Sequence, residues 1–429
     1  MENSVKNLIQ FIDHSPSCFH VIENAKKQFL EHGFIQLEEK EHWNLEEGKS
    51  YFVERNGSSM IAFHLPKKDF QGFHIVASHS DSPTYRIKEQ PEMSVEKHYT
   101  KLNIERYGGM IPETWFDRPL SVAGRIIIEE NGQIKDQLVN IDRDLVIIPD
   151  LAIHMSRSSN ESKQLNPQKD LLPLCGGNLT KDGFEEMIAK ESGVEKEDIL
   201  SYDLFLYNRM RGTTLGINEE FVAAPKLDDL ECAYSSIEGM LNAKLSEDYV
   251  TVCAVFDNEE VGSGTKQGAG STFFPEVLKR ISYLCGKNEE EYYMAVADSF
   301  MLSADNAHAV HPNYQDKTDP TNRPYINEGI VLKYNASQKY TTDANSAALV
   351  KYLCQKEKIK CQVFFNRSDM LGGSTLGNIL TGQVSIKAAD IGLPQLSMHS
   401  TYETAGCKDL DDMITLMGSF YELGKEVQI

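Results

Sequence analysis

One stretch constrains this chain more than any other. An apolar run, Val250–Phe256, is followed by two acidic residues, Glu259 and Glu260, and by two glycines, Gly262 and Gly264. The run predicts a buried strand. Because successive side chains of a strand point to opposite faces, the two carboxylates can serve one site only where the strand has ended and the backbone turns, which the glycines permit. Such a pair is typical of a metal ligand beside a general base, and also of a solvated turn after a core strand.

The overall composition argues against several classes of protein. The 429 residues are enough for two or three domains, and the formal net charge of -21 argues against nucleic-acid binding, which needs a basic surface. The eight cysteines contain no CxxC pair, which argues against a zinc ribbon or a disulfide framework. No window approaches the ~20 apolar residues of a membrane span, and the N-terminus lacks the apolar stretch of a signal peptide. We therefore expect a cytoplasmic protein with no nucleic-acid and no membrane partner.

The order of the predicted elements indicates an α/β fold. Strands and helices alternate over residues 1–91 and again over residues 213–429, whereas residues 92–212 are rich in predicted strands and poor in periodic helices. Alternation of this kind predicts a mostly parallel mixed sheet covered by helices on both faces. We therefore expect a discontinuous first domain, residues 1–91 and 213–429, interrupted by an inserted β-rich second domain, residues 92–212.

Polar residues gather where the apolar strands are predicted to end, and ligands of such folds bind at that edge of the sheet. They are His79 and Asp81 after Phe73–Ser78, Glu259 and Glu260 after Val250–Phe256, Asp305 after a strand predicted at 293–297, His399 after a strand predicted at 391–398, and Asp228 just before a helix. Imidazoles combined with carboxylates suit zinc or a related divalent ion. Five ligands suit two ions that share a bridge better than one tetrahedral ion. Each residue alone is also typical of a capping or surface group.

Seven blocks of sequence carry a family resemblance, in the same order as in the family and over nearly the full length. They are HSDSP (79–83), TWFDRPL (114–120), LAIH (151–154), APKLD (224–228), DNEEVGS (257–263), SADNAHAVHPNY (303–314) and MHS (398–400). With these blocks the chain resembles the aspartyl aminopeptidases, a family of di-zinc exopeptidases. The long block at 303–314 is the most specific of the seven.

The resemblance implies a role for each residue at the predicted metal site. Asp228 is expected to bridge two metal ions. His79 and Asp305 complete one metal site, and Glu260 and His399 complete the other. Glu259 is the expected general base, and Asp81 is expected to orient His79; a turn cap before Ser82-Pro83 is a compatible alternative for Asp81.

The resemblance also implies a set of substrate-binding residues. His308 and His154 are expected to hold the substrate, and His154 is expected to reach the site of a neighbouring subunit; an ordinary interface or core histidine is the alternative. Lys333 is expected to receive an acidic side chain of the substrate, or else is a strand lysine that extends to water. Gly373 and Ser374 are expected to bring backbone N–H groups close to the ligand, or else belong to a turn that starts a helix.

The function implied is a metallo-aminopeptidase that removes N-terminal residues, preferentially Asp and Glu, from peptides. Two divalent ions per subunit are expected, Zn²⁺ first and Mn²⁺ or Co²⁺ as alternatives. The resemblance further implies dimers that assemble into a dodecamer through the inserted domain. The alternatives are a di-metal amidohydrolase or deacylase on the same fold, and a non-catalytic cargo or binding protein. The chain departs from the usual family residues at Ser80, Lys226, Asp229 and Asn258.

Overall fold

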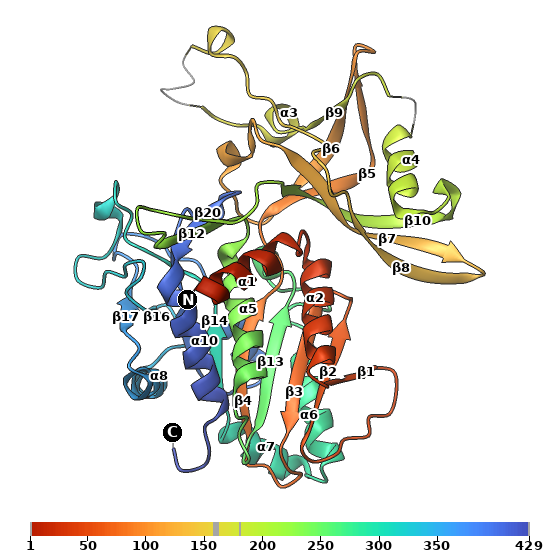
Figure 1. Ribbon diagram of the computed structural model, residues 1–429. Coiled ribbons are helices and arrows are strands. Elements are labelled where there is room, and N and C mark those ends of the chain that lie inside the picture. The colour runs from red at the N-terminus through yellow and green to blue at the C-terminus, as the bar shows by residue number, and fades with distance from the viewer. Residues whose placement is uncertain (1, 158–162, 180–181, 428–429) are drawn as a thin grey trace.

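The computed structural model describes residues 2–157, 163–179 and 182–427. Within these residues a nine-stranded sheet forms the centre of the larger of two units (Figure 1). Its strands, in spatial order, are β1 (Ile35–Leu37), β2 (Lys49–Arg55), β3 (Ser59–Leu65), β13 (Val250–Phe256), β4 (Phe73–His79), β14 (Phe300–Ala304), β18 (Lys387–Gly392), β16 (Ile330–Lys333) and β17 (Cys361–Phe364). Five of the neighbouring pairs are parallel and three are antiparallel. The prediction of a mostly parallel mixed sheet is therefore confirmed.

Helices cover both faces of this sheet, as predicted. One face carries α1 (Glu2–Asp13), α2 (Cys18–Glu31), α5 (Leu227–Asn242), α8 (Ala344–Glu357) and α10 (Cys407–Tyr421), and the other carries α6 (Phe273–Leu284), α7 (Glu289–Ala297) and α9 (Leu376–Gln383). Each face has its own apolar core: Val76 of β4 packs in the first, whereas its neighbours Ile75 and Ala77 pack in the second. Burial on both faces explains why the central strands are apolar throughout. No helix in the described part of the chain is long and apolar enough to cross a membrane.

Two predicted strands are wrong in their positions. Residues 293–297 belong to helix α7, because Asn288 and Glu291 form a capping box and three glutamates occupy the first turn of that helix. The strand that leads to Asp305 is β14, Phe300–Ala304. Residues 391–398 are divided: β18 ends at Gly392, and β19 (Pro394–Leu396) belongs to a separate small sheet.

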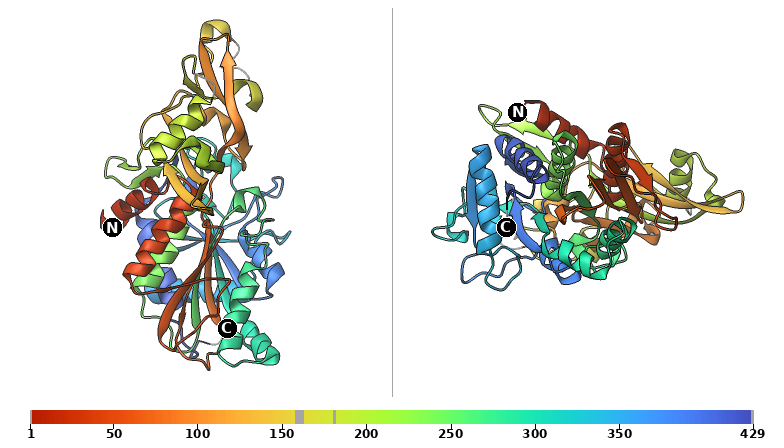
Figure 2. Two further views of the ribbon diagram at one scale, coloured as in Figure 1. Left: turned by 90° about the vertical axis from the view of Figure 1, so that its right-hand side faces the viewer. Right: turned by 90° about the horizontal axis from the view of Figure 1, so that it is seen from below.

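The second unit lies at one end of the molecule and has its own sheet and core (Figures 1 and 2). In spatial order its described strands are β8 (Gln133–Asn140), β7 (Leu120–Glu130), β10 (Ile199–Asn208), β5 (Thr84–Val95), β6 (Tyr99–Tyr107) and β9 (Leu174–Gly176), accompanied by α3 (Pro167–Asp170) and α4 (Gly183–Ser192). The boundary expected between residues 91 and 92 falls inside β5. The strands of this sheet instead begin at Thr84 and end at Asn208.

A small third sheet lies between the two units (Figure 1). Its described strands, in spatial order, are β11 (Thr213–Leu215), β12 (Phe221–Ala224), β20 (Glu403–Gly406), β19 (Pro394–Leu396) and β15 (Ala307–His308). Strands β12 and β20 lead directly into α5 and α10, and β15 carries His308. This sheet therefore fixes the loops that follow the central strands.

Candidate active site

A cavity of about 440 Å³ lies at the ends of the central strands. Ten of the residues singled out in the sequence line it: His79, Asp228, Glu259, Glu260, Asp305, His308, Lys333, Gly373, Ser374 and His399. His79 is the last residue of β4, Asp305 directly follows β14, and Glu259 begins a short 3₁₀ turn, Glu259–Val261, shortly after β13. The backbone turns there as the sequence requires, because Asn258 and Gly262 on either side of it both have positive φ.

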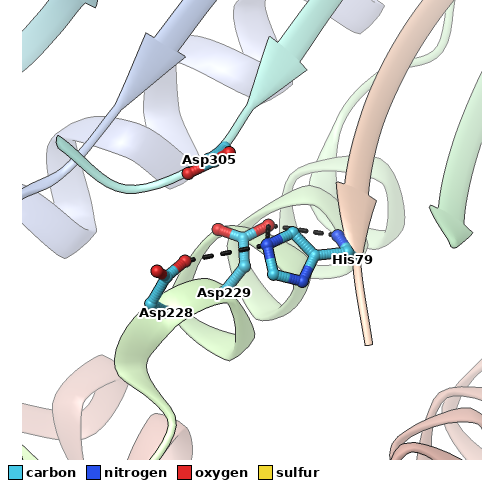
Figure 3. A group of neighbouring side chains, drawn as sticks. All are labelled: His79, Asp228, Asp229 and Asp305. Carbon is cyan, nitrogen blue, oxygen red and sulfur yellow. Dashed lines mark hydrogen bonds and ion pairs between the residues drawn. The ribbon is translucent and has the colours of Figure 1, made fainter. Parts of the chain in front are cut away.

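The potential metal-binding side chains form three overlapping groups, in each of which the ligand atoms lie within 4.8 Å of one another. The groups are His79, Asp228, Asp229 and Asp305 (Figure 3); His79, Glu259 and Glu260; and Asp228, Glu260 and His399. Asp228 lies between the two histidines: its Oδ1 is 3.7 Å from His79 Nε2, and its Oδ2 is 3.2 Å from His399 Nε2. All five predicted ligands are thus brought together around Asp228.

The electrostatics of this group fit a cation. Burial, followed by the charge of Asp228, raises the pKa of Glu260 well above its usual range, and burial raises the pKa of Glu259 to about 8. In the described chain the buried Asp228 Oδ1 and Glu260 Oε1 accept no hydrogen bond. Buried carboxylate oxygens left without donors are costly. A divalent ion held by carboxylate and imidazole atoms would satisfy them, so the residues present fit zinc.

Asp229 belongs to the first group, although the sequence did not suggest it as a ligand. Its peptide bond with Asp228 is cis. Its Oδ2 accepts a hydrogen bond from the backbone N–H of His79 at 3.1 Å and lies 3.9 Å from His79 Nε2. The side chain is fully buried and does not line the cavity. It therefore supports His79 from behind.

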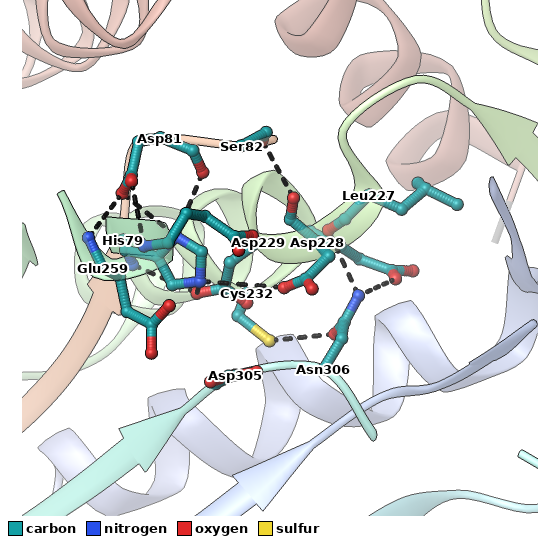
Figure 4. A network of polar contacts seen from close by, with 12 residues as sticks. His79, Asp81, Ser82, Leu227, Asp228, Asp229, Cys232, Glu259, Asp305 and Asn306 are labelled. Carbon is teal, nitrogen blue, oxygen red and sulfur yellow. Dashed lines mark hydrogen bonds and ion pairs between the residues drawn. The ribbon is translucent and has the colours of Figure 1, made fainter. Parts of the chain in front are cut away.

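Asp81 lies behind the cavity, where it connects His79 to the acidic pair (Figure 4). Its backbone carbonyl accepts a hydrogen bond from His79 Nδ1 at 3.0 Å, which leaves Nε2 facing Asp228. Its carboxylate accepts from the backbone N–H groups of Glu259 and Glu260, each at 3.1 Å. Asp81 therefore caps the turn that carries the acidic pair in addition to holding His79.

Two residues that the sequence did not single out complete this arrangement. Tyr107, from β6 of the second unit, donates to Asp81 Oδ2 at 2.7 Å and accepts from Asn258 Nδ2 at 2.7 Å. Glu403 of β20 accepts from the backbone N–H groups of Asp228 at 3.0 Å and of His399 at 2.7 Å. Neither residue can be identified from its neighbours in the sequence, because its hydrogen-bond partners lie on another element or more than a hundred residues away.

Lys333 is 2% exposed, so the alternative of a strand lysine that extends to water is wrong. Its ammonium donates to the carbonyls of Asp305 at 2.7 Å and Asn306 at 3.2 Å, and lies 3.4 Å from Asp305 Oδ1. Burial acts to lower the lysine pKa, but the negative charges around it, that of Asp305 first, outweigh burial and raise the pKa. Lys333 is therefore a charged group in the wall of the cavity.

The remaining substrate candidates differ in position. Gly373 and Ser374 line the cavity and directly precede Thr375, the N-cap of α9, so this segment also starts a helix. His308 lines the cavity with its ring 6.1 Å from that of Phe364. His154 lies instead on an exposed 3₁₀ turn of the second unit, Ile153–Met155, and does not line the cavity. Its surroundings are exposed, so it is not a core histidine.

Comparisons with known proteins show which family the chain belongs to. The family model described as aminopeptidase I zinc metalloprotease (M18) matches residues 11–421. A Clostridium acetobutylicum protein named probable M18 family aminopeptidase 2 is 45% identical and covers 97% of this chain and 98% of its own. A Pseudomonas aeruginosa protein of the same name is 37% identical and covers 97% of each chain.

Solved structures give the same result. In the cryo-EM structure of the Ape4 and Nbr1 complex, a chain that is 37% identical superposes with a TM-score of 0.95, covering 98% of this chain and 85% of that one. The S. cerevisiae mApe1 dodecamer matches with a TM-score of 0.86 at 27% identity, covering 98% and 97%. The chain therefore belongs to the M18 family of zinc metalloproteases and is a zinc aminopeptidase.

Proposed function

We propose that this aminopeptidase uses two metal ions and Glu259 to remove N-terminal residues, preferentially Asp and Glu, from peptides. The observation that supports this most is the position of Asp228 between two histidine-containing ligand groups. A panel of aminoacyl and N-acyl substrates, offered to the zinc-loaded protein, tests the proposal. Hydrolysis confined to the N-acyl compounds would favour the deacylase alternative, and binding without any turnover would favour a cargo protein.

The ligand groups suggest how two ions would be held. His79 and Asp305 would bind one ion, Glu260 and His399 the other, and Asp228 both. When bound, the ions would supply Lewis acidity that activates water and polarises a carbonyl group. Zinc analysis of the purified protein tests the number: two ions per chain are expected, and a stable content of one ion in the active protein would contradict the bridging role of Asp228.

Glu259 would transfer a proton from the attacking water to the departing amine. It lines the cavity beside His79 and Glu260, and its backbone is fixed by the hydrogen bond to Asp81. From this position its carboxylate would accept a proton from the attacking water and donate that proton to the departing amine nitrogen. Because Glu259 is not one of the five residues expected to hold the ions, its role as base can be tested apart from metal binding.

Lys333 would select acidic substrates. It is a cation in the cavity wall, held by Asp305 and Asn306, with the ring of Tyr340 5.2 Å from its ammonium. A substrate carboxylate that enters beside it would form a charge-assisted hydrogen bond of about 1.5–3 kcal/mol. Leucine, which has no charged group, would gain nothing from this contact.

The substitution Lys333→Met tests this selection. We expect the ratio of kcat/KM for N-terminal Asp over N-terminal Leu to fall by about tenfold or more, because the charged hydrogen bond is lost. Zinc content is measured in parallel, because Lys333 also contacts Asp305. An unchanged ratio would reject Lys333 as the selecting residue, and loss of zinc with an unchanged ratio would assign it to the support of Asp305 alone.

We also propose that the second unit, from β5 to β10, mediates assembly into dimers and a dodecamer, and that His154 enters a neighbouring subunit's cavity. Leu151, Ile153 and Met155 around His154 are large apolar side chains that are exposed in the single chain. Exposed apolar groups of this kind favour a protein interface. S. cerevisiae mApe1, which this chain resembles in fold, is a dodecamer, and this supports assembly into a dodecamer.

A mixing experiment tests whether His154 acts in trans. His154→Ala and Glu259→Gln are each expected to be nearly inactive. If the two variants are coexpressed, a Glu259→Gln subunit can supply its His154 to a His154→Ala neighbour whose Glu259 is intact, and part of the activity should return. Activity no higher than the sum of the single variants would contradict the proposal, and light scattering measures the mass of the assembly.

A further inference from the structure

Asn306 is a buried residue whose side chain has no part in the proposed reaction. It directly follows Asp305, is 2% exposed, and lines the cavity that contains the predicted metal ligands (the metal-site cavity). The amide side chain of an asparagine offers two N–H hydrogens and an oxygen with two lone pairs. Such a group can connect several segments of a chain at one point.

The side chain of Asn306 is bonded to the start of α5. Its Nδ2 donates to the carbonyl of Leu227 at 3.1 Å and to Glu231 Oε2 at 3.2 Å. Its Oδ1 accepts from the thiol of Cys232 at 3.1 Å (Figure 4). Since Asp228 directly follows Leu227, these bonds join the loop after β14 to the segment that carries the ligand proposed to bridge the ions.

The same side chain also reaches the segment that leads to His399. Its Nδ2 donates to Gln395 Oε1 at 2.9 Å, and its Oδ1 accepts from the backbone N–H of Leu393 at 3.4 Å. Gln395 Nε2 in turn donates to Glu403 Oε1 at 3.4 Å. The carboxylate of Glu403 accepts from the backbone N–H groups of Asp228 and His399. One amide is thus connected to the segments of three predicted ligands.

The partners in this network are shielded from solvent. Each is no more than 1% exposed: Leu227, Glu231, Cys232, Leu393, Gln395 and Glu403. If the amide hydrogens were lost, buried acceptors would be left without a donor, which is costly because solvent does not reach them. A change at Asn306 is therefore expected to displace the segments that carry the ligands.

We propose that Asn306 is a positioning residue for both metal ions. Its amide fixes the loop of Asp305 against the segment of Asp228, and through its partners on β19 and β20 it supports His399. The inference rests on the two-ion site proposed above, in which these three ligands belong to both ions. Residues that hold metal ligands from outside typically contribute about ten- to hundredfold to metal affinity.

The substitution Asn306→Leu tests the proposal, because leucine has nearly the same shape, forms no hydrogen bonds and adds no charge near the ligands. The zinc dissociation constants of the full chain are measured by competition with a chromophoric chelator, and circular dichroism shows whether the zinc-free variant is folded. We expect zinc to bind at least about tenfold more weakly at both sites. The control is Asn24→Leu, which should bind zinc as the unaltered protein does. The amide of Asn24 joins α2 to the turn after α1 and does not line the metal-site cavity.

The substitution Gln395→Met provides a second test, which also applies if Asn306→Leu does not fold. It breaks the link to Glu403 and leaves the bonds between Asn306 and α5 intact, so zinc should bind more weakly than in the unaltered protein. The double variant should lose less affinity than the two single losses combined predict, because both residues act through one contact.

Unchanged zinc affinity in folded Asn306→Leu would overturn the proposal, and unchanged affinity in folded Gln395→Met would overturn the support of His399. A merely structural role would lower the stability of the zinc-free protein and leave zinc affinity as it is. If the unaltered protein holds one zinc ion, the two-ion proposal fails, and the affinity of Asn306→Leu for that ion still decides whether Asn306 supports metal binding. The two failures are therefore distinguishable.

Discussion

At the scale of single residues, Asp81 shows how one side chain can arrange several others. Its carboxylate holds the backbone of Glu259 and Glu260, while its carbonyl accepts from His79. The carboxylate of Glu259 is thereby free to face the cavity. Its neighbour Glu260 faces His399, with 3.4 Å between Oε1 and Nε2. One turn thus presents two adjacent carboxylates for different tasks.

The substitution Glu259→Gln separates these tasks. It keeps the size of the side chain and removes its capacity to accept a proton, so kcat should fall by about 10²–10⁴. Zinc content should stay the same, because Glu260 and His399 are untouched. Steady-state kinetics and zinc analysis measure the two effects, with the exposed Glu290→Gln as control. A rate near that of the unaltered protein at normal zinc content would remove Glu259 from the role of base.

At the scale of elements, the 3₁₀ turn Glu259–Val261 depends on strand β6 of the other unit. Tyr107 reaches across to Asp81 and Asn258, which brackets the turn from both sides. Asn258 is further fixed by Gln267 Nε2, which donates to its Oδ1 at 2.8 Å. The second unit therefore contributes to the geometry of the acidic pair although it supplies none of the potential metal ligands in the described chain.

Tyr107→Phe tests this dependence on β6. The phenyl ring keeps the packing against Phe205 but leaves Asp81 and Asn258 without one hydrogen bond each. We expect kcat to fall by about tenfold with KM little changed, since a lost bond of about 1–1.5 kcal/mol acts on the position of the base and not on substrate binding. An equal loss of kcat in Tyr202→Phe, whose hydroxyl donates to the carbonyl of Lys88 within the second unit, would indicate a general destabilisation instead.

The elements also show how far sequence reasoning reaches. Strand ends such as His79 and Asp305 could be predicted as site residues, because the carboxyl ends of parallel strands share one edge. The sequence predicts a strand at 293–297, which lies in the helix Glu289–Ala297, because this helix has few apolar residues and its capping box precedes them. Tyr107, Asp229 and Glu403 could not be predicted, since their roles arise from tertiary hydrogen bonds that leave no local pattern.

At the scale of the whole molecule, the buried central sheet makes stability depend on pH. His74 of β4 is 2% exposed and stacks on Tyr249 with ring centroids 4.0 Å apart. Within the described chain its Nδ1 has no hydrogen-bond partner. Burial lowers its pKa from 6.5 to about 3. The unfolded chain therefore binds a proton between these pH values and the folded chain does not.

This difference predicts the direction in which the free energy of unfolding changes with pH. The contribution of neutral His74 is fully present above pH 6.5 and is lost as the pH falls toward about 3, with a slope of about 1.4 kcal/mol per pH unit. Urea midpoints measured between these values should fall less steeply with decreasing pH in His74→Phe than in the unaltered protein. His42→Gln, which removes an exposed histidine, should keep the steep dependence. Parallel slopes for His74→Phe and the unaltered protein would contradict the assignment.

The groups around the metal-site cavity are spread along the polypeptide from His79 to His399. A ribosome must therefore release almost the entire polypeptide before the last of them can join the others. With the site proposed above, the growing chain would carry no active peptidase during its own synthesis. A chain that terminates anywhere upstream of His399 would be hydrolytically silent.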